Sequence, residues 1–326
     1  MATDDSNPSG NRARSLHNIE ESLRSKHGQV VANLAAELLS RRPGEHSLRV
    51  QEYASLFNAS AGTVQSALNY LQAAGAASLE GRGRRGTLIR NLQYPLLWSL
   101  AVGRPIIGVM PLPYTKRFEG LATGIRSQFS QHPLDLDLRF MRGAVTRLQV
   151  LSSSECDWVV LSRFAANTAN AHGFEIEIVM TLKPKTYMAD HVLLLPGPTT
   201  NNLQDGMRVG IDPMSTDHSA VVRSICRGKQ VKYVEINYSQ GLDLIRAGTI
   251  DATVWSQEDV PTELDNLTVV SLEGQNEPIL EQTSEAAIVV NRGGLPVLHV
   301  LEAALEQVEL HQIQQDVVQK RRLPSY

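Results

Sequence analysis

The sequence predicts an N-terminal winged helix-turn-helix domain, all-α apart from its wing, followed by a two-lobed α/β domain. Three observations predict this arrangement. Two amphipathic helix patterns lie close together between Ser47 and Leu71, and two short apolar runs around a glycine-rich turn follow them. From Pro105 onward, short apolar runs alternate with helical stretches, which is the pattern of an α/β domain with a largely parallel sheet.

The centre of the first domain is a pair of helices joined by a short turn. Apolar residues recur at i, i+3, i+4 and i+7 in both segments, so each helix has one apolar and one polar face. Only Asn58 and Ala59 separate the first helix from Ser60, a good N-cap residue. The apolar positions are Val50, Tyr53, Ala54 and Phe57, then Val64, Ala67, Leu68 and Leu71. Two amphipathic helices joined this tightly indicate a helix-turn-helix.

A predicted hairpin follows the second helix. Gly75 offers a helix end, and short strands at 77–80 and 87–90 flank the turn at 81–86. The turn contains Arg82, Arg84 and Arg85 and no acidic residue. Arginine on a flexible tip suits phosphate oxygens or a narrow minor groove, so double-stranded DNA is the expected partner. The alternative is a packing unit of similar shape with no nucleic-acid partner.

These segments, in this order, resemble the winged helix-turn-helix of the GntR class of bacterial transcription regulators. The segments that carry the resemblance are 50–56, 60–71, 74–75 and 83–89, within the first quarter of the chain. In that class the recognition helix often begins with arginine that reads guanine, whereas Ala61, Gly62 and Gln65 stand there in this chain. Glutamine can pair with adenine instead, and hydroxyl groups mostly hold phosphate. The predicted DNA-binding residues are Arg49, Ser60, Thr63, Gln65, Ser66, Asn69, Arg82, Arg84 and Arg85.

Net charge differs between the N-terminal segment and the rest of the chain. Up to Pro95 there are 11 Lys and Arg against 8 Asp and Glu, a net charge of +3. The remainder has 20 against 26, a net charge of −6, which agrees with DNA contact at the N-terminal end alone. The predicted segments are a disordered tail at 1–14, the winged domain at 15–92, a connector at 93–104 and the two-lobed domain at 105–326. Lobe 1 is expected at about 105–200 and 275–326, and lobe 2 at about 201–274.

The connector is too apolar for a free linker. It contains Tyr94, Leu97 and Trp98, and we expect it to pack on the second domain or on a second subunit. A homodimer is the expected state, because two-fold regulators bring two wings to one palindrome.

The overall composition is that of an ordinary globular protein, with 42% hydrophobic and 20% charged residues over 326 positions. No apolar run approaches the ~20 residues of a membrane-spanning helix, and the N-terminus lacks the blocks of a signal peptide. A cytoplasmic location and no membrane partner are therefore expected. Cys156 and Cys226 are too few for a disulfide framework and not at metal-ligand spacing, so no metal and no cofactor are expected.

The second domain resembles the two-lobed type 2 periplasmic-binding-protein fold, in the form used as a sensor by several regulator families. The match is clearest at Met207–Asp217 and at Leu244–Val254, the latter a helix, a Gly-x-x-Asp-Ala turn and a strand. Joined to a GntR-like head, the pairing resembles the YhfZ family over nearly the whole chain. The resemblance implies a DNA-binding regulator with a small-molecule effector, whose identity the fold does not give.

Ligands in open parallel sheets bind beyond the carboxyl ends of strands, near helix N-termini that attract anions. Ser215 and Thr216 could hold a carboxylate or phosphate, with Arg163 reaching it from the other lobe. A small, anionic effector is the resulting prediction, although such residues can also be plain helix caps. The predicted ligand-binding residues are Pro111, Tyr114, Thr115, Arg142, Ser162, Arg163, Asp212, Ser215, Thr216, His218, Asn237, Tyr238 and Trp255.

An enzyme is the alternative hypothesis, because Asp212, Asp217 and His218 lie close together in sequence. No further ligands stand at metal spacing, and no nucleophile elbow is present. A transferase on the two-lobed fold, with a helical head that does not bind DNA, remains the second interpretation. The arginine-rich wing favours the regulator, which is predicted not to be an enzyme.

Overall fold

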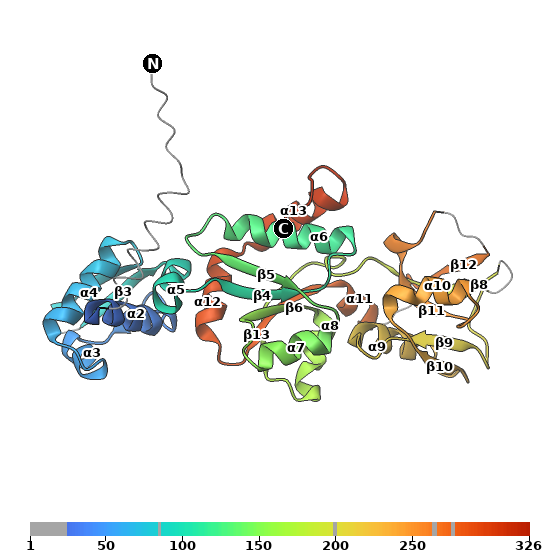
Figure 1. Ribbon diagram of the computed structural model, residues 1–326, viewed down its shortest axis with the longest axis horizontal. Coiled ribbons are helices and arrows are strands. Elements are labelled where there is room, and N and C mark those ends of the chain that lie inside the picture. The colour runs from blue at the N-terminus through green and yellow to red at the C-terminus, as the bar shows by residue number, and fades with distance from the viewer. Residues whose placement is uncertain (1–24, 84–85, 198–200, 263–265, 275–277) are drawn as a thin grey trace, which may run out of the picture. The chain divides into compact units, whose positions relative to one another are not determined.

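The computed structural model describes residues 25–83, 86–197, 201–262, 266–274 and 278–326. The chain divides into two compact units (Figure 1). Unit 1 contains residues 1–105 with 132–135 and 298–304, and unit 2 contains 106–131, 136–297 and 305–326. The predicted tail at 1–14 and the predicted residues Arg84 and Arg85 lie outside the described residues.

Three helices form the core of unit 1. They are α2 (Lys26–Leu39), α3 (Val50–Leu56) and α4 (Ala61–Ala73), and they bury Leu34, Tyr53 and Leu71 completely. Ser25 and Ser60 cap α2 and α4, because each side chain accepts a hydrogen bond from a first-turn backbone N–H. The predicted helix-turn-helix is therefore confirmed.

The predicted hairpin is also present. The strands β2 (Ala77–Gly81) and β3 (Thr87–Leu92) pair antiparallel, and β1 (His46–Ser47) adds a short third strand on the other edge of β3. This three-stranded sheet, packed beside α4, completes a winged helix-turn-helix.

The connector packs within unit 1, and its packing on the second domain or on a second subunit stays a prediction. Residues Tyr94–Val102 form helix α5, which packs against α2. The side chains of Leu97 and Trp98 are buried there, because α2 presents an apolar surface that α3 and α4 leave uncovered. Gly103 ends the helix with a left-handed backbone conformation, φ 68°.

The C-terminal segment forms two helices, α12 (Leu295–Ala304) and α13 (Gln307–Val318). The Glu306 side chain caps α13, because it accepts hydrogen bonds from the Val308 and Glu309 backbone N–H groups. Residues 298–304 were assigned to lobe 1 but pack within unit 1. His299 is buried there, with Nδ1 2.8 Å from the Leu39 carbonyl oxygen, where it caps the end of α2.

Lobe 1 of unit 2 is built on a five-stranded sheet with the order β5-β4-β6-β13-β7. The strand β4 is parallel to β5 and β6, whereas β13 runs antiparallel to β6 and β7. The strands are β4 (Ile106–Met110), β5 (Leu136–Phe140), β6 (Trp158–Ser162), β7 (Ile176–Thr181) and β13 (Ala286–Asn291). The carboxyl ends of β4, β5 and β6 therefore share one edge of the sheet.

Helices cover both faces of this sheet (Figure 1). One face carries α6 (Lys116–Phe129) and α13, and the other carries α7 (Ala144–Ser152), α8 (Arg163–Ala169) and the short turn η2 (Asn170–His172). The helices α6 and α13 approach closely at Gly120, where a Cβ atom would lie 2.8 Å from the Gln314 carbonyl oxygen. Glycine at this position therefore sets the spacing of the two helices.

Lobe 2 contains two small sheets. The strands β9 (Arg208–Ile211) and β10 (Lys232–Glu235) are parallel, and β8 (His191–Pro196) lies between the antiparallel β11 (Thr253–Ser256) and β12 (Leu267–Ser271). The helical segments are α9 (Thr216–Ile225), η3 (Tyr238–Gln240), α10 (Gly241–Arg246) and η4 (Gln257–Asp259). Helix α11 (Pro278–Ser284) contacts α8 and β6 of lobe 1 and α9 of lobe 2.

This arrangement corrects the predicted lobe boundary. Residues 191–196 were assigned to lobe 1, yet β8 is the central strand of a lobe 2 sheet. The prediction of a largely parallel sheet is also wrong for this lobe, because β8 pairs antiparallel with both β11 and β12. A fully apolar run fits a buried strand in either kind of sheet, so the sequence could not decide which lobe would take it.

Candidate functional site

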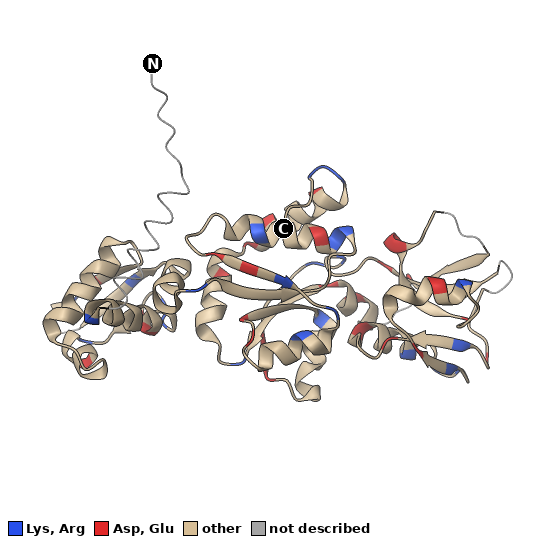
Figure 2. Ribbon diagram, viewed as in Figure 1, with Lys and Arg blue, Asp and Glu red and all other residues tan. Residues whose placement is uncertain are grey.

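The exposed face of α4 carries the predicted base-reading residues. Ser60 Oγ accepts from the Thr63 backbone N–H at 3.1 Å and lies 2.9 Å from the Thr63 hydroxyl. Gln65 donates to Asn69 Oδ1 at 3.0 Å, and Ser66 lies 3.3 Å from His27 of α2. Hydrogen bonds among these side chains hold their positions. Helix α4 has no charged residue between Ala61 and Ala73 (Figure 2).

Positive charge stands beside that surface rather than on it. Arg49 is exposed at the start of α3, and Arg82 lies at the end of β2. Arg82 and Arg90 both donate to Glu80, with Arg82 Nε 3.2 Å from Oε1. The hydrogen bond from Arg90 is the main reason that the pKa of Glu80 is lowered. Arg90, which is exposed on β3, was not among the predicted DNA-binding residues.

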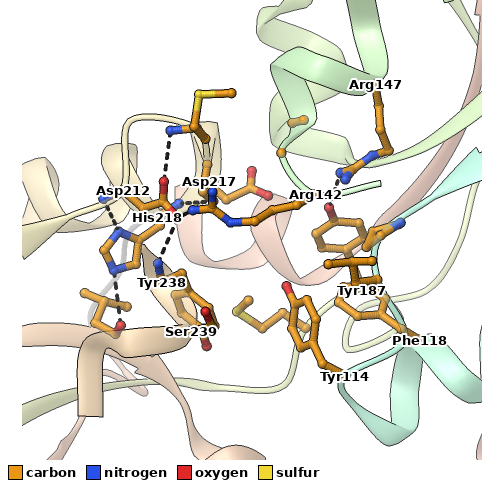
Figure 3. A pocket seen from close by; sticks show the side chains of 18 of the residues that line it. Tyr114, Phe118, Arg142, Arg147, Tyr187, Asp212, Asp217, His218, Tyr238 and Ser239 are labelled. Carbon is orange, nitrogen blue, oxygen red and sulfur yellow. Dashed lines mark hydrogen bonds and ion pairs between the residues drawn. The ribbon is translucent and has the colours of Figure 1, made fainter. Parts of the chain in front are cut away.

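Unit 2 contains a pocket between its two lobes. Its volume is about 110 Å³. Helix starts and strand ends of both lobes meet there (Figure 3). The lining residues are Pro111, Leu112, Tyr114, Phe118, Arg142, Gly143, Ala144, Arg147, Tyr187, Met188, His191, Asp212, Met214, Ser215, Asp217, His218, Tyr238, Ser239 and Val254.

The structure brings together about half of the predicted ligand-binding residues. Those that line the pocket are Pro111, Tyr114, Arg142, Asp212, Ser215, His218 and Tyr238. Those that do not line it are Thr115, Ser162, Arg163, Thr216, Asn237 and Trp255. Thr115, Arg163, Thr216 and Asn237 follow strands as predicted. Ser162 and Trp255 lie within β6 and β11 instead.

Local contacts explain why most of these six residues do not line the pocket. Thr115 caps α6, and Asn237 accepts from the Ser239 backbone N–H. Trp255 stacks behind Tyr238, with ring centroids 4.5 Å apart. Arg163 Nη1 pairs with Glu285 Oε2 at 2.6 Å, and the anion fork from Arg163 stays a prediction. Thr216 is the first residue of α9. It is half-buried and does not line the pocket.

Asp212 is the most densely bonded carboxylate in the pocket. Only 2% of the residue is exposed. Its Oδ2 lies 2.5 Å from Arg142 Nη2 and 2.9 Å from the Tyr238 backbone nitrogen, and its Oδ1 accepts from the Met214 N–H at 3.0 Å. Arg142 comes from lobe 1 and the other partners from lobe 2. The acid is therefore neutralised and fully used within the protein.

His218 is held as a neutral ring. The Asp212 backbone N–H donates to Nδ1 at 3.0 Å, so the ring proton is on Nε2, which lies 3.2 Å from the Val254 carbonyl oxygen. Burial lowers the pKa of His218 to about 4. Because both ring nitrogens are engaged, His218 is not available as a general base.

Arg147 is one of the lining residues that were absent from the predicted ligand-binding set. It is 2% exposed, and its guanidinium donates to the Val160 and Met141 carbonyl oxygens and to the Tyr187 hydroxyl at 2.8–3.0 Å. All three acceptors are neutral, and no carboxylate among the described residues forms an ion pair with it. A signal existed, since Arg147 falls on the same helical face as Ala144 and Leu151, where an apolar residue is expected.

Asp217 enters the pocket from α9 of lobe 2. It is 6% exposed, and Ser162 of lobe 1 donates to its Oδ1 at 2.5 Å. Burial raises the pKa of Asp217 to about 6, although the Ser162 hydrogen bond and the charge of Arg147 both act to lower it. Ser162 therefore does not line the pocket itself but donates a hydrogen bond to Asp217, which does.

The two units define a helix-turn-helix head joined to a two-lobed α/β domain. A helix-turn-helix domain family model matches residues 42–89, and the YhfZ C-terminal domain family model matches residues 93–326. The chain belongs to the YhfZ family. The GntR-like subtype of the head stays a prediction.

Two YhfZ proteins agree with this assignment. The chain is 31% identical over 304 residues to YhfZ of Escherichia coli (strain K12), which covers 92% of this chain and 98% of that protein. The crystal structure of YhfZ from Shigella flexneri is similar with a TM-score of 0.61 and 29% identity, over 72% of this chain and 98% of that one. The periplasmic aliphatic sulphonate-binding protein SsuA from Escherichia coli is similar with a TM-score of 0.49 and 15% identity, over 67% of this chain and 75% of that one.

Two general features of the described residues complete the picture. None of their helices combines the length and the apolar character needed to cross a membrane. In the same part of the chain, His, Cys, Asp and Glu side chains do not gather into a group of three or more that could hold a metal ion.

Proposed function

We propose that this chain is a transcription regulator whose winged helix-turn-helix binds double-stranded DNA and whose pocket binds a small anionic effector. The effector changes the affinity for DNA. The observation that carries the effector half of the proposal is Arg147, a buried cation in the pocket with only neutral partners among the described residues.

Burying a guanidinium without a counter-ion is costly, and an anion beside it restores the lost interaction. The guanidinium has five N–H groups, and three of them have protein acceptors. The remaining two suit a carboxylate, sulfonate or phosphate oxygen. Arg142 is less suited to this role, because Asp212 already occupies it.

The DNA half rests on the fold and on the family. The surface of α4 offers amide and hydroxyl groups for base edges, and Arg49, Arg82 and Arg90 supply charge for phosphates around it. Such a regulator works in the cytoplasm. As a homodimer it would bind an inverted repeat, with half-sites one helical turn or a multiple of it apart. Arg84 and Arg85 of the wing are included in the proposed contact.

A catalytic role is not part of the proposal. A transferase would need an activated nucleophile or a free general base in the pocket. His218 has both ring nitrogens engaged, and Asp212 is fully bonded. The proposed effector is bound and released unchanged.

Genomic DNA capture with the full chain tests the DNA half first. The captured fragments are expected to share an inverted repeat, and fluorescence anisotropy should show binding that weakens steeply with salt. Gln65→Ala should then cost about 1–3 kcal/mol at one base pair of the repeat and little elsewhere. Capture of fragments with no common sequence, bound equally well by Gln65→Ala, would contradict the proposal.

A further inference from the structure

Two buried charges of opposite sign line the pocket without contacting each other. Arg147 comes from α7 of lobe 1 and Asp217 from α9 of lobe 2 (Figure 3). They are 2% and 6% exposed. Within the described part of the chain, neither side chain has an oppositely charged partner at ion-pair distance. Each therefore lacks the counter-charge that a buried ionic group normally has.

The other ionisable groups of the lining do not supply a counter-charge to Arg147 or Asp217. Arg142 and Asp212 neutralise each other. His191 and His218 are neutral near pH 7, because burial lowers the pKa of each to about 4. The hydroxyl groups of Tyr114, Tyr187 and Tyr238 are neutral too, since burial raises their pKa values. A ligand with a single charge would satisfy Arg147 or Asp217 and leave the other alone.

The size of the pocket limits what can satisfy both. About 110 Å³ is roughly the room of three or four water molecules. Apolar and aromatic side chains, among them Phe118, Met188 and Val254, make up much of the wall. A small molecule with an anionic group at one end and a cationic group at the other matches this distribution, with a short apolar spacer between them.

We propose that the effector is a small zwitterion, an amino-carboxylate or amino-sulfonate, with its anionic group on Arg147 and its ammonium group on Asp217. This inference rests on the proposed effector site and specifies its ligand. Because the two charges belong to different lobes, the zwitterion ties lobe 1 to lobe 2. Ligand binding therefore favours the arrangement in which Arg147 and Asp217 face the same pocket.

A thermal-shift screen of the full chain provides the test. The probes are the standard amino acids, β-alanine and taurine, each at millimolar concentration, with acetate and propionate as acids that lack an ammonium group. At least one zwitterion is expected to raise the melting temperature. Its N-acetyl derivative, which lacks the positive charge, and its amide, which lacks the negative charge, should both bind at least tenfold more weakly by calorimetry.

Asp217→Asn is the decisive variant, since it removes the charge but keeps the shape and can still accept the Ser162 hydrogen bond. It should bind the zwitterion and its N-acetyl derivative equally, whereas the matched lobe 2 variant Asp251→Asn should keep the preference. Arg147→Lys, which keeps the charge but loses the planar fork, should weaken both ligands. Equal binding of both ligands by the unmodified protein, or a preference that survives in Asp217→Asn, would overturn the inference.

The outcomes separate this inference from the proposed function. If acetate or propionate binds and shifts DNA affinity while every zwitterion is inert, the regulator stands and the zwitterion is wrong. If a zwitterion binds as described and DNA affinity stays constant, the ligand class stands and the regulatory role is wrong. If no probe of either kind raises the melting temperature, the zwitterion inference fails.

Discussion

Arg142 and Asp212 form an ion pair across the pocket, with 2.5 Å between Nη2 and Oδ2. The arginine follows β5 of lobe 1, and the aspartate follows β9 of lobe 2. A second pair, Arg117 with Glu258, and the Ser162–Asp217 hydrogen bond also join the lobes. The relative arrangement of the two lobes is thus held by polar contacts formed by the protein itself.

Replacing Arg142 by alanine should destabilise unit 2. Asp212 would remain buried with two backbone donors but no cation. Because the arginine side chain is 39% exposed, the cost is expected to be about 1–2 kcal/mol, less than for a fully buried pair. Urea denaturation measures it. Arg139→Ala, which breaks an exposed pair with Asp137, is the control, and equal losses in the two variants would refute the importance of the bridge.

Glu80 is expected to weaken DNA binding by holding Arg82 and Arg90. Glu80→Gln should therefore tighten binding several-fold, more at low salt than at high salt, because two guanidinium groups become free for phosphates. Anisotropy titrations at two salt concentrations measure this. Asp137→Asn changes the net charge equally and serves as the control. Weaker binding by Glu80→Gln would show that the carboxylate instead positions the arginines for contact.

The pKa of Asp217 predicts a pH-dependent stability. Burial raises its pKa in the folded state to about 6, above the ordinary value of 3.8, so folding disfavours the ionised carboxylate. The associated stability is fully present below pH ~4 and is lost as pH rises through about 6. Asp217→Asn, which is always neutral, should match the unmodified chain at pH 4 and exceed it by about 3 kcal/mol at pH 8.

Denaturant unfolding at the two pH values checks this sign. Asp251→Asn is the useful comparison, because the hydrogen bond from Arg208 lowers the pKa of Asp251. That variant should be less stable than the unmodified chain at both pH values, because a lowered pKa contributes stability above the ordinary value of 3.8 and loses it only as the pH falls further. An Asp217→Asn variant that is less stable than the unmodified chain at pH 8 would mean that the ionised carboxylate is well compensated in the folded state.

The α6–α13 contact depends on Gly120. Gly120→Ala would place a Cβ atom 2.8 Å from the Gln314 carbonyl oxygen, so the helices must separate. We expect a loss of about 1–3 kcal/mol in thermal or urea unfolding. Gly62→Ala in α4 meets only the Ser60 hydroxyl at 3.8 Å and should be neutral or stabilising by up to ~1 kcal/mol. Equal effects of the two substitutions would show that the contact can adjust.

The helix-turn-helix and most strands could be predicted because their apolar spacing is set by local geometry. The regular pattern from Val50 to Leu71 left one reasonable fold for that segment. The course of β8 could not be predicted in the same way, since a continuous apolar run suits any buried strand. Its place in lobe 2 is fixed by pairing with β11 and β12, which are distant in sequence.

The site was predicted only in part for a related reason. Asp212 and Tyr238 follow strands, and the rule for parallel sheets places such residues at the ligand edge. Arg163 follows a strand too, but its partner Glu285 is 122 residues away and could not be foreseen. Arg147 lies inside helix α7, and that rule applies only to residues that follow strands. Its basic side chain on an apolar face was the available signal.

The most direct test of the account is the affinity of the full chain for its captured operator, measured by anisotropy with and without the best-binding zwitterion. We predict a change of about 5–150-fold for the unmodified chain, in line with ordinary allosteric coupling, and no change for Asp217→Asn. An operator affinity that is the same with and without the ligand, despite saturation of the pocket, would contradict the account.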